Sequence, residues 1–201
     1  MKKSITKSEN YLIGQCLKSW YDLATSEQIL LGKRWYTDAQ DYAKYLSMKY
    51  NIEVYICATV ISCLSPNNKW ERNKIDAENV IKAWIAGIPP ESIKVCTYNA
   101  NKVKAFLALD GQLISEKSPK THAFAMNVGL KSADHITIDK WHLRACMFTP
   151  DDGIKECVES CTIVQYRRVE KITAQLAQEL NLKGYELQAI IWVTIKNNWG
   201  R

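Results

Sequence analysis

The chain has 201 residues, of which 47% are hydrophobic and 24% are charged, and its net charge is +6. This composition excludes a disordered chain and suffices for one sizeable core or two closely joined lobes. No run of 18 apolar residues occurs, so no helix is expected to span a membrane. The basic charge favours an anionic partner, although many basic proteins bind no nucleic acid. Met1 and the residues after it lack an apolar signal-peptide core, which predicts a cytoplasmic location.

The chain contains seven cysteines, an odd number, and no Cys-x-x-Cys motif. Without a signal peptide, these features argue against a disulfide framework. Cys157 and Cys161 are four residues apart, with Cys146 upstream, but no fourth ligand follows nearby. We therefore expect small buried hydrophobic side chains, no metal site and no cofactor.

Helical spacing of apolar residues dominates the chain, which predicts an all-α fold. The most apolar stretch, 52–64, is rich in β-branched residues, but its length and its neighbours favour a buried helix over a strand. Gly32 and Gly129 are interpreted as helix ends. Helices or helical turns are expected over 8–24, 26–32, 37–50, 52–64, 70–86, 91–96, 100–109, 119–128, 139–147, 162–180 and 185–197.

The stretch 117–145 carries the sharpest chemical signal. Pro119 suits the first turn of a helix, and Lys120 follows it. Residues 136–138 are β-branched and extended, and they lead to Asp139 at the start of the next helix. A lysine and a carboxylate at two helix starts could face a common cleft. Taken singly, Lys120 is more typical of a solvated lysine at a helix start, and Asp139 is more typical of a helix N-cap.

The motif order resembles the helix-hairpin-helix DNA glycosylases of the endonuclease III type. Pro-Lys-Thr-His-Ala at 119–123 resembles the end of the family hairpin, Gly-x-Lys-Thr-Ala, and Ile-Asp-Lys-Trp-His at 138–142 resembles its Val-Asp-Thr-His segment. Ser-Pro-Asn-Asn at 65–68 and Leu-Gln-Ala-x-x-Trp at 187–192 are most similar to a phage and bacterial branch linked with unusual DNA bases. The resemblance covers roughly residues 35–146.

The resemblance implies two helical lobes with a cleft between them, within one all-α unit spanning 1–201. The central lobe with the hairpin would be 30–135, and the second lobe 1–29 plus 136–201. It also implies a bacterial or phage-infected host cell, and we favour a monomer.

The resemblance implies a role for each matching residue. Lys120 would attack the sugar C1′ and form a Schiff base, and Asp139 would stabilise positive charge on the sugar. Asn67 would enter the duplex where the base has been flipped out. Further DNA contacts are expected at Asn68, Lys69, Arg72, Lys102, Lys117 and Thr121. The base pocket is expected to include Trp70, Trp141 and His142.

Three functions remain open at this point. The first is a DNA glycosylase, with lyase activity, that acts on a damaged or modified base in double-stranded DNA. The second is an enzyme that modifies the base further on the same scaffold and leaves the sugar bond intact. The third is a non-catalytic DNA-binding module, because the hairpin segment 115–118 lacks the family's glycines.

Overall fold

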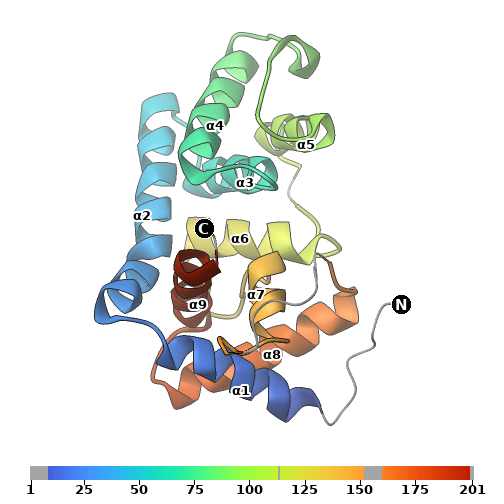
Figure 1. Ribbon diagram of the computed structural model, residues 1–201. Coiled ribbons are helices and arrows are strands. Elements are labelled where there is room, and N and C mark those ends of the chain that lie inside the picture. The colour runs from blue at the N-terminus through green and yellow to red at the C-terminus, as the bar shows by residue number, and fades with distance from the viewer. Residues whose placement is uncertain (1–8, 113, 152–159, 200–201) are drawn as a thin grey trace. The chain divides into compact units, whose positions relative to one another are not determined.

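The computed structural model describes residues 9–112, 114–151 and 160–199 (Figure 1). Within these residues the chain forms nine α-helices, one short 3-10 helix and no strand, which confirms the all-α class. The chain divides into two compact units. Unit 1 comprises residues 1–36 and 133–201, and unit 2 comprises residues 37–132, whereas the lobe boundaries expected from the sequence were residues 30 and 135.

Helix α3 (Val54–Leu64) is the centre of unit 2. It packs against α4 (Trp70–Ile85), α5 (Asn99–Leu109) and α6 (Pro119–Leu130) (Figure 1). The last eight residues of α3, from Cys57 to Leu64, are all buried. A helix covered on every side is apolar all round, which explains why this stretch lacked a helical period. The expectation of a buried helix rather than a strand is confirmed.

Unit 1 is built from α1 (Glu9–Asp22), α7 (Lys140–Ala145), α8 (Ile163–Glu179) and α9 (Gly184–Trp199), together with the start of α2. Helix α9 packs against α1, α7 and α8. Their apolar faces share a core that includes Leu17, Trp20, Leu187 and Ile191. The indole Nε1 of Trp20 also donates to the carbonyl of Phe148, at 2.7 Å, and so ties α1 to the residues after α7.

Helix α2 (Ser26–Tyr50) is continuous, although a helical turn ending near Gly32 and a separate later helix were expected. A Cβ at Gly32 would lie 2.5 Å from the Cα of Ile190, inside van der Waals contact. Gly32 therefore permits a close approach of α2 to α9 and does not end the helix. Helix α2 begins in unit 1 and continues into unit 2.

The expected end of α6 at Gly129 is wrong for the same reason. Helix α6 continues to Leu130 and is closed by Lys131 in the left-handed conformation. A Cβ at Gly129 would lie 2.8 Å from the Tyr55 ring, so the missing side chain allows α3 and α6 to pack closely. The Gly129 carbonyl also accepts a hydrogen bond from Gln40, at 3.2 Å.

The expected helix over 91–96 is reduced to a 3-10 turn, Pro90–Ser92. The backbone is extended at Ile93, with φ −115° and ψ 149°. The residues that follow lie in a loop held by side chains of α4 and α5, and that loop belongs to the candidate site. In the described ranges, none of the helices combines the length and the apolar character that crossing a bilayer requires.

Candidate functional site

Asp139 follows a short extended segment that is held against helix α8. The hydroxyl of Tyr166 accepts from the backbone N–H of Ile138, at 3.1 Å, and donates to the carbonyl of Ile136, at 2.7 Å. The carboxylate of Glu170 accepts from the backbone N–H of Ile136, at 3.1 Å. Each of these bonds is buried, so the segment is paired with side chains in place of a neighbouring strand. This pairing fixes where Asp139 leaves the segment.

The Asp139 carboxylate caps helix α7. Its Oδ1 accepts from the backbone N–H of His142, at 2.8 Å, and the Asp139 backbone is extended, as expected of an N-cap. The helix start expected at this residue is confirmed. Asp139 is only partly buried, so the residue keeps some contact with solvent.

A buried tyrosine lies close to Asp139 in unit 1 and gave no signal in the sequence. Tyr36 donates from its hydroxyl to Oε1 of Gln188, at 2.8 Å, and its oxygen is also hydrogen-bonded to Thr137. Burial raises the pKa of Tyr36 well above 10, the negative charge of Asp139 raises it further, and the bond with Thr137 opposes both effects. Tyr36 therefore stays neutral and keeps its hydroxyl proton, which it donates in the hydrogen bond to Gln188.

His142 lies in the core of unit 1, with 1% of its surface exposed. Its Nε2 lies 2.9 Å from the hydroxyl of Thr173, which donates its own proton to the carbonyl of Val169. The imidazole must therefore donate from Nε2, which leaves Nδ1 unprotonated and without a hydrogen-bond partner. Burial lowers the pKa of His142 to about 3. This position corrects the expectation that His142 lines a base pocket, because a sealed ring cannot contact a base.

Trp141, also expected in the base pocket, is partly exposed and has two cations over its ring. The Arg144 guanidinium carbon lies 4.6 Å from the ring centroid, and Nζ of Lys196 lies 5.0 Å from it. Nζ of Lys196 also lies 5.6 Å from the ring centroid of Trp192. Attraction between cations and aromatic faces stabilises this group, so a base stacking on Trp141 would compete with it.

Lys120 lies at the start of α6 in unit 2, directly after Pro119, and its side chain is partly exposed. The next residue, Thr121, is joined to α3, because the hydroxyl of Ser62 donates to its carbonyl at 2.6 Å. Lys117 is exposed on the turn before the helix. Lys120 and Asp139 thus belong to different units, and each is positioned by the helices of its own unit.

Asn67 and Asn68 form the turn between α3 and α4. Asn67 is exposed and takes the left-handed conformation, with φ 58°. Its Nδ2 donates to the hydroxyl of Tyr98, at 2.9 Å, and Tyr98 is 63% exposed. Asn68 instead points inward and donates from Nδ2 to the buried Asp76, at 2.9 Å. The contact between Asn67 and Tyr98 could not be predicted, because it joins residues 31 positions apart.

The basic residues expected to contact phosphate differ in their surroundings. Lys69 is exposed, and Arg72 pairs its Nε with Oδ1 of Asp76, at 2.9 Å. Lys102 is only 4% exposed, and its Nζ donates to the carbonyl of Ile93, at 2.7 Å. Lys102 is therefore a buried anchor, which corrects its assignment as a surface DNA contact.

Trp70 packs between α2 and α4 in unit 2. Its ring lies edge-on to Tyr42, with centroids 6.3 Å apart, and Nζ of Lys74 lies 5.8 Å from its centroid. The Tyr42 hydroxyl donates to the Lys74 carbonyl, at 2.8 Å. These contacts give partly buried Trp70 a packing role within unit 2.

The cysteines are mostly packing residues, as expected. Cys57, Cys63 and Cys146 are buried, Cys16 and Cys161 are partly buried and Cys96 is exposed, whereas Cys157 lies outside the described residues. Burial raises the pKa of the Cys57 thiol to about 11 and that of Cys63 to about 12. Over the described part of the chain, no group of three or more His, Cys, Asp or Glu side chains could hold a metal ion.

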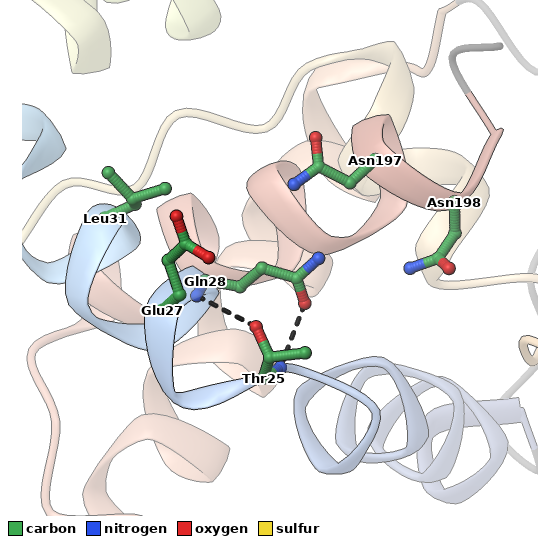
Figure 2. Close-up of a pocket in the computed structure, with 6 residues that line it drawn as sticks. All are labelled: Thr25, Glu27, Gln28, Leu31, Asn197 and Asn198. Atoms are coloured by element: carbon green, nitrogen blue, oxygen red, sulfur yellow. Dashed lines mark hydrogen bonds between the residues drawn. The ribbon is translucent and has the colours of Figure 1, made fainter.

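A pocket of about 460 Å³ opens between the start of α2 and the end of α9 (Figure 2). Thr25 and Gln28 cap α2 reciprocally at this point, with backbone-to-side-chain bonds of 3.0 and 3.2 Å. None of the residues expected to act in catalysis or to bind DNA lines it. Its lining consists of Thr25, Glu27, Gln28, Leu31, Asn197 and Asn198.

These features define an all-α protein of two helical units, one presenting a capping carboxylate and the other a lysine at a helix start. The chain belongs to DUF7178, a family of unknown function, whose sequence profile matches residues 2–199. No match was found among curated proteins or among solved structures.

Proposed function

We propose that this protein binds double-stranded DNA and cleaves the N-glycosidic bond of a damaged or modified base, with Lys120 as the attacking amine and Asp139 as the stabilising carboxylate. One observation carries the proposal. Both groups begin helices in the motif order of the glycosylases, and both side chains are partly exposed rather than sealed in a core.

The local environment of each group suits its proposed role. Asp139 already accepts one hydrogen bond from the backbone N–H of His142, which orients its carboxylate. The extended segment before it is fixed by Tyr166 and Glu170, so the carboxylate needs little reorganisation. Lys120 follows Pro119 on a helix anchored to α3 through Thr121, which limits the motion of its backbone.

The reaction follows from these roles. The neutral amine of Lys120 attacks the sugar C1′, and the bond from C1′ to the base breaks. The base leaves with the bonding electron pair and takes up a proton, while Asp139 stabilises the positive charge that develops on the sugar. Opening of the sugar ring gives a Schiff base, and loss of a 2′ proton then eliminates the 3′ phosphate, which accounts for lyase activity.

Borohydride trapping tests this chemistry, because reduction of the Schiff base fixes the DNA to the protein. We expect a covalent adduct with duplexes that carry a panel of lesions and modified bases, and its loss in Lys120→Gln. Lys44→Gln is the matched control, since Lys44 is an exposed lysine of the same unit and is not among the expected DNA contacts. The absence of an adduct with every duplex would refute the lyase step, and normal excision by Lys120→Gln would identify water as the nucleophile.

Asp139→Asn separates catalysis from folding. Asparagine caps helices about as well as aspartate, so stability should change by less than about 0.5 kcal/mol. We expect base release to fall by at least about 100-fold, because a charge that stabilises the transition state is lost. Mass spectrometry of the reacted DNA distinguishes the alternatives: released base supports glycosylase activity, an altered nucleoside supports base modification, and unchanged DNA that remains bound supports a non-catalytic module.

A further inference from the structure

Two loops of unit 2 lie against each other and share their exposed tip. The first loop, 65–69, joins α3 to α4, and the second, 93–98, precedes α5. The hydroxyl of Thr97 in the second loop donates to the carbonyl of Pro66 in the first, at 2.9 Å. At the tip, Asn67 donates to the hydroxyl of Tyr98, also at 2.9 Å.

A single buried carboxylate joins the bases of these two loops. Asp76 on α4 is completely buried. Its Oδ2 accepts from Nδ2 of Asn68 in the first loop, at 2.9 Å, and from the backbone N–H of Cys96 in the second, at 2.8 Å. Its Oδ1 accepts from Nε of Arg72, at 2.9 Å. A buried carboxylate is tolerated only when it is paired and hydrogen-bonded, so losing one of these donors would leave an uncompensated charge.

The second loop has no regular structure, yet side chains of α5 hold both of its ends. Lys102 donates to the carbonyl of Ile93, at 2.7 Å, and Asn101 donates to the hydroxyl of Thr97, at 2.9 Å. Such an irregular loop would otherwise be mobile. These anchors leave little freedom for Tyr98, the last residue of the second loop before α5.

The exposed tip presents groups that suit a nucleic acid. Tyr98 offers an aromatic face, Asn67 offers an amide, and Lys69 and Lys94 are exposed cations on the same two loops. Two acidic groups beside the first loop are neutralised, because Asp76 pairs with Arg72, at 2.9 Å, and Glu71 pairs with Lys74, at 2.8 Å. Glu91, just before the second loop, is exposed. Aromatic stacking combined with basic contacts to phosphate is a common way to bind nucleic acid bases and backbone.

We propose that Asp76 is a positioning residue that locks loops 65–69 and 93–98 into one DNA-contacting surface, with Asn67 and Tyr98 at its tip. This inference rests on the DNA partner of the proposed function but not on its chemistry. Asp76 itself touches no DNA; its carboxylate sets the relative position of two segments that are both needed for contact.

Hydrogen exchange without DNA tests the coupling directly. In Asp76→Asn we expect amides of both loops to exchange at least about tenfold faster, because the shared acceptor loses its charge and one of its two accepting oxygens. Val80→Ala is the matched control, since Val80 is a fully buried apolar residue of the same helix. Its truncation should destabilise unit 2 without removing a hydrogen bond to either loop. Faster exchange in only one loop, or an equal change in Val80→Ala, would overturn the role of Asp76.

Fluorescence anisotropy with a labelled duplex, at several salt concentrations, tests the surface. Tyr98→Ala should weaken binding by at least about fivefold, whereas Tyr11→Ala, a change at an exposed tyrosine of unit 1, should leave it unchanged. Asp76→Asn should weaken binding as much as Tyr98→Ala does, and Val80→Ala should not. Equal affinity of Tyr98→Ala and the unaltered protein would overturn the surface.

Excision measured in the same samples keeps the two proposals distinct. Weakened binding by Tyr98→Ala, with no base released by the unaltered protein, would overturn only the glycosylase chemistry. Base release with unchanged binding by Tyr98→Ala would overturn only the proposed surface. The substitution Asn67→Gly isolates the amide, because glycine keeps the left-handed backbone, and Asn181→Gly, with φ 55° in unit 1, is its matched control.

Discussion

Tyr166→Phe should destabilise unit 1 through the loss of a single oxygen atom. The Tyr166 side chain is buried, and its hydroxyl is bonded to the backbone N–H of Ile138 and the carbonyl of Ile136. Phenylalanine keeps the ring and its packing but removes a partner from two buried backbone groups. An unsatisfied buried polar group costs about 1–3 kcal/mol, so the combined loss for the two groups should be about 2–6 kcal/mol.

Urea unfolding followed by circular dichroism measures this loss from the shift of the midpoint at constant slope. Tyr21→Phe is the matched control, because Tyr21 packs against the same core and its hydroxyl makes no hydrogen bond within the described residues. That control should change stability by less than about 0.5 kcal/mol. Equal effects of the two substitutions would refute the view that Tyr166 holds the segment before Asp139.

Three further predictions concern the glycine contact, the buried histidine and the two lysines. Gly129→Ala should destabilise unit 2 by about 1–3 kcal/mol, measured by urea unfolding, because the added methyl meets the Tyr55 ring; unchanged stability would contradict the close packing of α3 and α6. The pKa of His142 is lowered to about 3, so between pH 6.5 and pH 3 the unfolded chain binds one proton that the folded protein does not. The contribution of His142 to stability is therefore complete above pH 6.5. It falls by about 1.4 kcal/mol per pH unit as the pH drops from 6.5 towards 3. In His142→Gln, the urea midpoint should change less with pH in that range. In the unaltered protein, nitrogen NMR of the His142 ring should show the neutral tautomer with its proton on Nε2 at pH 5. Lys69→Gln should lower the slope of log affinity for DNA against log salt by about 1, whereas Lys102→Met should leave that slope unchanged; an equal loss in both would contradict the burial of Lys102.

The errors in the expected helix ends at Gly32 and Gly129 have one physical origin. Gly32 and Gly129 were interpreted as helix ends because glycine is flexible and is a poor helix former. In the structure each lies inside a helix where another helix approaches closely, and that packing offsets the weak helix propensity. A glycine needed for a turn and a glycine needed for a close contact look the same in one sequence.

The sequence alone determined what depends on neighbouring residues. Pro119 sets the start of α6 and Asp139 that of α7, because proline geometry and N-capping act within one helical turn. The apolar stretch ending at Leu64 required burial, whatever covered it.

Tertiary structure decided what depends on distant residues. The burial of Lys102 needs the carbonyl of Ile93, the sealing of His142 needs Thr173, and the exposed pair of Asn67 and Tyr98 needs two loops held by Asp76. A charged or polar side chain has no fixed burial of its own, since its burial depends on whether the fold supplies a hydrogen-bond partner. That partner is chosen by packing between segments, which one sequence does not record.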